Sequence, residues 1–196
     1  DIVDIAPSDA VGLSYSSPQM TASNVMFQGS TTQEVSTIYV DVGTVNWDGV
    51  HMDSIVGSAD PAVKMTNLAQ LNWTNSVISS LVNGIVLDTG SSSTPSNLNL
   101  TGLTFTDCTK SGSDRGGGAL DIGLANDTLI LQDVTFNNNA ADNVSGGALH
   151  ISQNPPTGTD PTHARASLTN IQFGGNSAPN GGGLYHIMSG ATASYT

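Results

Sequence analysis

Three side chains that could bind a metal ion occupy matching places in three glycine-rich blocks. The blocks are Gly117-Gly-Ala-Leu-Asp-Ile122, Gly146-Gly-Ala-Leu-His-Ile151 and Gly182-Gly-Leu-Tyr-His-Ile187. Asp121, His150 and His186 each lie between two apolar positions, so in stacked strands they would point outward in one column, about 4.8 Å apart. Carboxylates and imidazoles bind divalent metals, but a column presents parallel rather than convergent ligands. A solvated polar face is the alternative interpretation, and we expect no metal ion and no cofactor.

Two further groups could take part in catalysis. Cys108 is the only cysteine, and no basic residue is placed to activate its thiol. Asp107, Asp114 and Arg115 share one segment, and a pectate lyase or polygalacturonase site needs clustered carboxylates, often with a Lys or Arg. Because no second acidic cluster falls at the matching place in the next repeat, we expect no enzyme. A carbohydrate-binding or carbohydrate-cleaving protein remains the alternative.

The charge balance excludes one class of partner. The chain has 16 acidic and 4 basic side chains and a formal net charge of −12. Nucleic-acid binding needs a basic surface, so nucleic acid is not an expected partner. No apolar run approaches the roughly 18 residues that a membrane-spanning helix needs, so we expect no direct membrane span.

The chain contains an internal repeat. Its clearest copies align without gaps and read Leu-x-x-aliphatic-x-Phe-x-x-Asn or Cys; they are Leu100–Cys108, Leu131–Asn139 and Leu168–Asn176. Each copy precedes one glycine-rich block. Weaker copies upstream place an aromatic at the same point, so that the aromatic recurs as Phe27, Trp47, Trp73, Phe105, Phe136 and Phe173.

The repeat predicts the fold. Apolar residues alternate within each block, which is the period of a strand, and the Gly pairs favour sharp corners. A unit of this length cannot bury its apolar face alone and must stack on its neighbours. We therefore predict an all-β, right-handed parallel β-helix of about six coils forming a single domain, residues 1–196. A β-sandwich of hairpins is the alternative, but only Asn83-Gly84 and Asn180-Gly181 match its two-residue turns, and the longer two-block period does not suit it.

Stacking predicts particular columns of side chains. We expect Phe105, Phe136 and Phe173 in one inward column of core aromatics. Another inward column is expected to hold Leu120, Leu149 and Tyr185. Asn139 and Asn176 would form a hydrogen-bonded ladder between coils. Cys108 would cap that ladder as a small buried residue.

The paired motifs resemble the repeats of the chlamydial polymorphic outer-membrane proteins, which alternate Phe-x-x-Asn with Gly-Gly-Ala-aliphatic. The pairs here are Phe136–Asn139 with Gly146–Leu149, and Phe173–Asn176 with Gly182–Leu184. The resemblance covers residues 98–187, with Cys108 in place of Asn in the first copy and Leu184 in place of Ala in the last. It implies a parallel β-helix at a cell surface, with adhesion as the usual role.

We therefore expect an extracellular or cell-surface structural or adhesive module without enzymatic activity. Loops on a rigid scaffold usually carry the binding surface, so a host-cell or glycan ligand would contact the inserted loops 109–115 and 154–165. An uncovered end of the stack would be a template for another strand. It would take either further segments of a longer chain or another subunit in an end-to-end filament. Four sequons are candidate glycosylation sites, namely Asn72, Asn99, Asn126 and Asn143.

Overall fold

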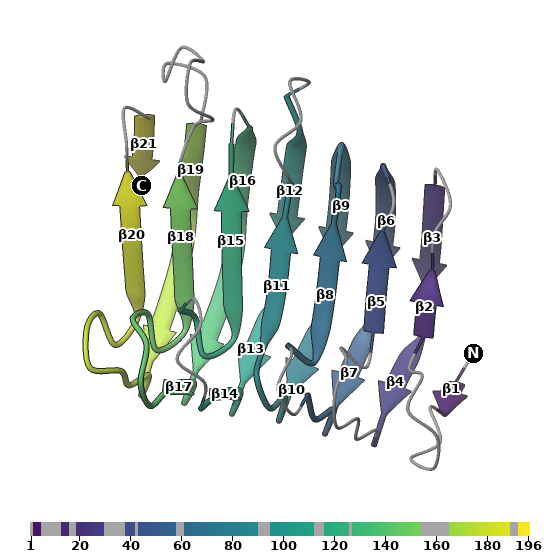
Figure 1. Cartoon of the computed structure of the whole chain (residues 1–196), viewed down its shortest axis with the longest axis horizontal. Helices are drawn as coiled ribbons and strands as arrows, with labels where there is room; N and C mark the ends of the chain where they lie inside the picture. The colour runs from purple at the N-terminus through teal and green to yellow at the C-terminus, as the bar shows by residue number, and fades with distance from the viewer. Residues whose placement is uncertain are drawn as a thin grey trace.

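The fold is taken from a computed structural model of the chain. It describes residues 2–4, 13–15, 19–29, 38–41, 43–57, 61–89, 95–111, 116–125, 127–153, 165–188 and 192–196. The prediction of an all-β parallel β-helix is confirmed, because every named strand pairs in parallel with strands of the neighbouring coils (Figure 1).

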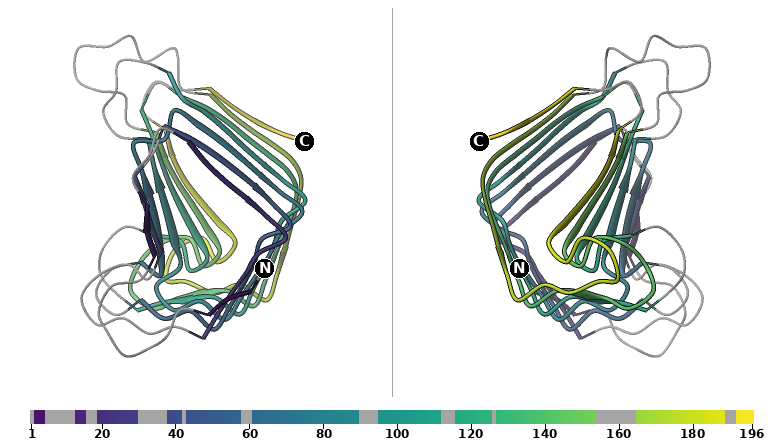
Figure 2. Two further views of the ribbon diagram at one scale, coloured as in Figure 1. Left: turned by 90° about the vertical axis from the view of Figure 1, so that its right-hand side faces the viewer. Right: turned by 90° about the vertical axis from the view of Figure 1, so that its left-hand side faces the viewer.

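Each coil contributes strands to three ladders, and Figure 2 looks along the stack so that these straight segments superimpose. Ladder I consists of β3 (Gln19–Ser23), β6 (Thr44–Asp48), β9 (Gln70–Thr74), β12 (Asn97–Thr101), the first halves of β16 (Thr128–Asn137) and β19 (Arg165–Gly174), and β21 (Thr192–Tyr195). Ladder II consists of β1 (Ile2–Asp4), β4 (Met26–Gln28), β7 (His51–Asp53), β10 (Val77–Ser79), β13 (Thr104–Thr106) and the second halves of β16 and β19.

Ladder III is a separate sheet of seven strands. It consists of β2 (Leu13–Tyr15), β5 (Ile38–Asp41), β8 (Val63–Thr66), β11 (Ile85–Asp88), β15 (Leu120–Leu124), β18 (Leu149–Gln153) and β20 (Leu184–Met188). A short two-stranded sheet of β14 (Thr109–Lys110) and β17 (Ala140–Ala141) follows ladder II.

The corners beside ladder II are each made by a single residue with positive φ. The corner between ladders I and II is formed by Asn24, Gly49, Asn75, Gly102, Asp133 and Asn170, with Asp133 at φ 54°. The corner after ladder II is formed by Gly29, Ser54, Ser80, Asp107, Asn138 and Gly175. Gly, Asn and Asp tolerate this left-handed conformation better than other residues, which explains the polar residues at these two columns.

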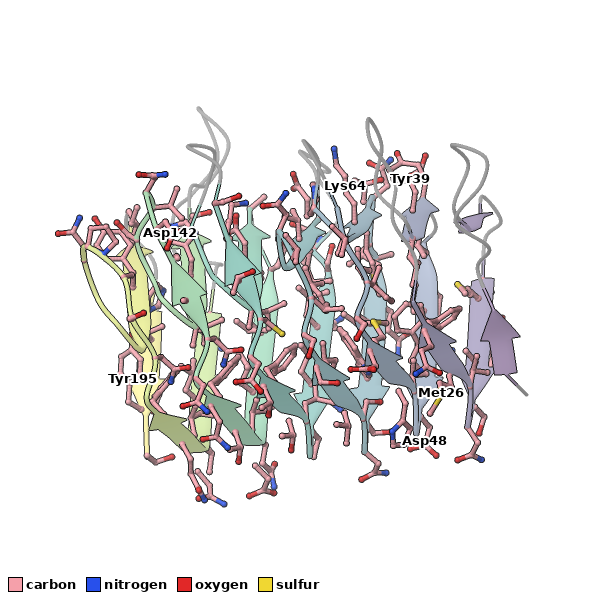
Figure 3. All side chains as sticks on the ribbon, turned by 90° about the horizontal axis from the view of Figure 1, so that it is seen from below. Met26, Tyr39, Asp48, Lys64, Asp142 and Tyr195 are labelled. Carbon is pink, nitrogen blue, oxygen red and sulfur yellow. The ribbon has the colours of Figure 1, made fainter. Side chains whose placement is uncertain are left out.

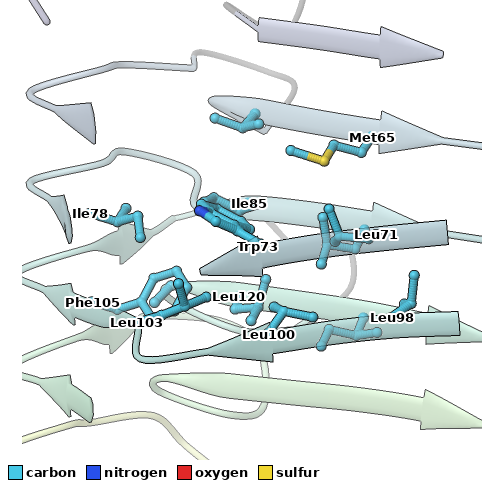
Figure 4. Packing of buried hydrophobic residues seen from close by; sticks show 14 of the residues in the cluster. Met65, Leu71, Trp73, Ile78, Ile85, Leu98, Leu100, Leu103, Phe105 and Leu120 are labelled. Atoms are coloured by element: carbon cyan, nitrogen blue, oxygen red, sulfur yellow. The ribbon is translucent and has the colours of Figure 1, made fainter. Parts of the chain in front are cut away.

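Inward side chains of the three ladders fill one continuous core, in which alternate strand residues are buried (Figure 4). The strand register corrects the predicted place of the two tryptophans. Trp47 pairs with Trp73, and Trp73 pairs with Leu100 of ladder I, whereas Phe27 pairs with Met52 of ladder II. The alignment that put both Trp residues in the Phe column is therefore wrong, because the apolar alternation alone could not tell one ladder from the next.

The six aromatics nevertheless form one chain of ring contacts. Phe27, Trp47, Trp73 and Phe105 contact one another at ring-centroid distances of 5.3–6.3 Å with tilted or edge-on geometry. Phe105, Phe136 and Phe173 stack nearly parallel, with centroids 4.9 and 5.3 Å apart. Phe173 ends this stack and is 39% exposed, unlike the other five, which are buried.

Candidate functional site

The glycine-rich blocks lead into the last three strands of ladder III, and the register of the third block differs from the predicted one. Gly117, Gly146 and Gly181 share a positive φ, and a Cβ at any of them would lie within 2.5 Å of a backbone oxygen three residues on. Leu149 pairs with Leu184, and His150 pairs with Tyr185. The last block is therefore Gly181-Gly-Gly-Leu184, one residue earlier than predicted, with Gly183 in the Ala position.

The second glycine of each block is needed for close packing between coils. A Cβ at Gly118 would lie 2.1 Å from the Gly147 oxygen, and one at Gly147 would lie 2.2 Å from the Gly182 oxygen. Backbone of neighbouring coils thus fills the space that a side chain would need. The Gly-Gly pair serves two purposes, a sharp corner and a close backbone approach.

Asp121 and His150 lie beside each other on β15 and β18, and both are buried although they alternate with the core residues. The His150 Nδ1–H donates to Asp121 Oδ1 at 2.7 Å. Gly116 lies against the imidazole, since a Cβ there would come 3.1 Å from the ring atom Cγ, and a Cβ at Gly146 would come 3.3 Å from the His150 Cβ. Asp121 Oδ2 has no hydrogen-bond partner among the described residues. The pair is therefore a covered contact between two coils.

His186 does not join this column, so the predicted Asp121, His150 and His186 alignment is wrong. Tyr185 takes the third place and stacks on the His150 ring with centroids 5.7 Å apart. His186 pairs with Ile151 at a core position and contacts the Tyr195 hydroxyl. Burial lowers the pKa of His186 and raises that of Tyr195. The described residues hold no group of three or more metal-ligating side chains.

Asn139 and Asn176 form a ladder with a defined direction. The Asn139 amide donates to the Phe105 oxygen at 3.2 Å and to Asn176 Oδ1 at 2.9 Å. The Asn176 amide donates to the Phe136 oxygen at 2.9 Å, and Asn176 Oδ1 also accepts the backbone N–H of Asn139. Each Asn side chain thus donates to the Phe carbonyl of the preceding coil. It also accepts the backbone N–H of the residue that occupies the same place in that preceding coil.

Cys108 lies under this ladder, where its backbone N–H donates to Asn139 Oδ1 at 3.0 Å. Its thiol is fully buried and faces the Thr106 oxygen. Burial raises the pKa of Cys108 to about 12. A thiol with so high a pKa carries almost no thiolate at neutral pH and is a poor nucleophile.

The sequence reasoning missed polar columns on the outer surface and one buried carboxylate. Asp48, which points outward in Figure 3, accepts from the Thr74 hydroxyl at 2.7 Å and from the Asn75 amide at 2.8 Å. These two bonds lower the pKa of Asp48. Asp127 is buried and accepts from the Thr89 hydroxyl and the Ser96 N–H. Register between coils is the only signal that could have revealed them.

Three sequon residues can be placed. Asn72 is half-buried and donates to Asn46 Oδ1 at 2.8 Å, and Asn99 is half-buried and accepts from Thr101. Asn143 is exposed and donates to the Ser111 oxygen. Asn126, residues 112–115 of the first inserted loop and residues 154–164 of the second lie outside the described residues.

Comparison with known families locates the repeat. A family model of the Chlamydia polymorphic membrane protein repeat matches residues 133–152, which run from the Asp133 corner through Asn139 to the Gly146 block. The chain thus carries a repeat of this kind, and the resemblance is confirmed. The family description is a family-level indication of an outer-membrane or surface location. No curated protein and no solved structure matches the chain.

Among the described residues, no helix is long and apolar enough to cross a membrane.

Proposed function

We propose that this chain is an extracellular structural or adhesive module of a cell-surface β-helix, without enzymatic activity. The observation that carries the proposal is the repeat match at residues 133–152 on a continuous stack of coils. Two polar side chains of that stretch are engaged between coils. Asn139 bonds to both neighbouring coils and His150 bonds to Asp121, so these polar groups hold the coils together.

The outer faces support an adhesive role. Ladder I presents rows of amide and hydroxyl side chains, with Asn46, Asn72 and Asn99 in one row and Asp48, Thr74 and Thr101 in the next. Rows spaced by about 4.8 Å offer many equivalent weak contacts, and weak contacts made together give avidity. The formal charge of −12 favours neutral or cationic ligands over anionic ones.

The test places the purified chain on an array of immobilised glycans and, in parallel, with polygalacturonate in a reducing-sugar assay. Binding without release of reducing sugar is the expected result. A variant with residues 154–164 replaced by a short Gly-Ser linker tests whether a loop carries the contact, and it is expected to bind less. A second variant, Thr101→Ala, removes one of the many equivalent contacts on the face of ladder I and is expected to weaken binding less than the loop replacement does.

Release of reducing sugar would overturn the proposal and favour the carbohydrate-cleaving alternative. Absence of binding to every glycan, together with absence of binding to intact cells, would overturn the adhesive part. Unchanged binding after loop replacement but loss with Thr101→Ala would move the contact surface from the loop to the strand face.

A further inference from the structure

The outer face of ladder I is almost free of charge, although the chain as a whole is strongly acidic. In β3, β6, β9, β12 and the first halves of β16 and β19, the outward side chains are all half-buried or exposed. In these strands only Asp48 and Arg165 of the outward side chains are charged, and their charges are opposite, whereas the chain carries a formal net charge of −12. These strands form one straight side of the stack in Figure 2, so the face is set apart by charge as well as by shape.

The central row of this face holds three amides in register, namely Asn46, Asn72 and Asn99. Asn72 Nδ2 donates to Asn46 Oδ1 at 2.8 Å, and the Thr101 hydroxyl donates to Asn99 Oδ1 at 3.2 Å. These bonds fix the orientation of the amides. Among the described residues, none accepts a hydrogen bond from Nδ2 of Asn46 or of Asn99. The row therefore presents N–H donors to solvent at fixed places, whole coils apart.

The same row continues with an exposed aliphatic side chain. Ile130 pairs with Asn99 on one side and with Ser167 on the other, and it is 40% exposed. Its neighbours along the strand, Leu129 and Leu131, are buried in the core, so the Ile130 side chain points away from the core. The row thus combines an apolar surface with oriented hydrogen-bond donors. Sugar rings are recognised by this combination, because C–H groups cover their faces and hydroxyl groups line their edges.

The composition of the face disfavours two other kinds of ligand. The centres of protein–protein interfaces are rich in aromatic and other apolar side chains. Here Ile130 stands alone among outward amide and hydroxyl side chains of these strands. An anionic polymer would be repelled by the net charge of −12. An uncharged polymer rich in hydroxyl groups meets neither objection.

The geometry points to such a polymer: we propose that the face of ladder I binds an extended, uncharged polysaccharide that lies across the coils along Asn46, Asn72, Asn99 and Ile130. Its hydroxyl oxygens accept from the amides, and the face of one sugar ring covers Ile130. Because the row repeats every coil, about every 4.8 Å, one polysaccharide chain makes several weak contacts at once. This inference rests on the proposed adhesive role and adds to it the class of ligand and the surface that binds it.

Affinity electrophoresis of the full chain tests the class of ligand. Native gels contain one of three uncharged polysaccharides, hydroxyethyl cellulose, galactomannan or arabinoxylan, and a parallel gel contains anionic polygalacturonate. We expect at least one uncharged polysaccharide to retard the chain and polygalacturonate not to retard it. Absence of retardation in all three gels would overturn the proposal. If the chain still bound arrayed glycans or intact cells, the adhesive role would stand and only the surface assigned here would be wrong.

The length of the ligand tests the row itself. A disaccharide and a hexasaccharide prepared from the retarding polysaccharide are titrated against the chain by calorimetry. The hexasaccharide reaches over several coils and is expected to bind at least about tenfold more tightly. Equal affinities would show a single small site and would overturn binding along the row.

Three variants locate the site. Ile130→Asp places a charge under the sugar ring and is expected to weaken binding about tenfold or more, because the charge would have to lose its water. Val77→Asp is the matched control, since Val77 is also aliphatic, 41% exposed and outward, but lies in ladder II. It is expected to bind as the original chain does. Asn99→Ala removes one amide and should weaken binding about three- to tenfold.

Circular dichroism verifies that all three variants keep the fold. Equal weakening by Ile130→Asp and Val77→Asp would overturn the proposal, since the loss would then not depend on the face. Binding that is unaffected by Ile130→Asp but lost when residues 154–164 are replaced would assign the ligand to that loop instead. Self-association that Ile130→Asp abolishes, without retardation by any polysaccharide, would assign the face to a second copy of the chain.

Discussion

The coils before residue 111 and those after residue 116 are held together differently. In the earlier coils, large side chains fill the core with edge-on contacts, and the buried indole N–H groups of Trp47 and Trp73 find no hydrogen-bond partner in the part of the chain that the structure describes. In the later coils, Phe rings stack in parallel and Asn139 bonds to both neighbouring coils. The comparison teaches that the column after the second corner joins the earlier coils by apolar contact, whereas the same column joins the later coils by directed hydrogen bonds.

The column after the second corner shows this contrast most plainly. It holds the aliphatic residues Ile55 and Leu81 in the earlier coils, then Cys108, and finally Asn139 and Asn176. Aliphatic side chains tolerate any apolar neighbour, but an amide needs partners at fixed places. The later coils therefore select the coil that follows them.

Removing a stacked ring should have the largest effect on stability. Phe136→Ala leaves a cavity between two rings and is expected to lower the free energy of unfolding by about 3–5 kcal/mol. Phe173→Ala, at the half-open end of the same stack, should cost clearly less because its ring is already 39% exposed. Urea unfolding of both variants measures the difference, and equal losses would contradict the description of the end as open.

Removing His150 from its buried pair with Asp121 in ladder III should cause the second-largest loss of stability. His150→Ala leaves the buried Asp121 carboxylate without a partner and removes the ring stacked on Tyr185, so a loss of about 3 kcal/mol is expected. Adding Asp121→Asn should recover part of that loss, since the buried group is then neutral. Additive losses in this double-mutant cycle would show that the two side chains do not interact.

Removing an amide from the Asn ladder should lower the stability somewhat less. Asn139→Leu keeps the volume but leaves the Cys108 N–H without its acceptor and removes the amide donor to the Phe105 oxygen, so about 2 kcal/mol should be lost. Asn137→Leu, two residues earlier on the outer side, is the control and should stay within about 0.5 kcal/mol of the original chain. Thermal unfolding compares the stabilities of the two variants. If Asn139→Leu leaves the stability unchanged, the later coils are held together by apolar contact as the earlier ones are, and the contrast fails.

The outer polar columns of the earlier coils should contribute least. The pKa of Asp48 is lowered in the folded chain, so its stabilising effect is present above the unfolded value of 3.8 and is lost as the pH falls through the folded value. The difference in Tm between the original chain and Asp48→Asn should therefore shrink between about pH 6 and about pH 2.5. A difference that grows on acidification would contradict the assigned hydrogen bonds.

Much of the later half could be predicted from the sequence, because its motifs are short, apolar at fixed spacing and repeated. The residues of the Phe stack and the Asn ladder follow from the spacing of Leu131–Asn139 and Leu168–Asn176. The upstream coils could not be aligned as well, since Trp47 and Trp73 belong to ladder I rather than ladder II. Both ladders alternate with the same period, so the pattern does not identify the ladder.

The sequence by itself determined that the chain folds as a parallel β-helix, because its alternation, its corner residues and its repeat allow no smaller unit to bury an apolar face. Only the tertiary structure decided which residues meet across coils. A run of three glycines at Gly181–Gly183 permits two registers, and contact with the preceding coil selected the one that pairs His150 with Tyr185 and turns His186 toward the core. The reason is that a glycine carries no side chain to set its own register, so the place is set by the backbone already stacked beneath it.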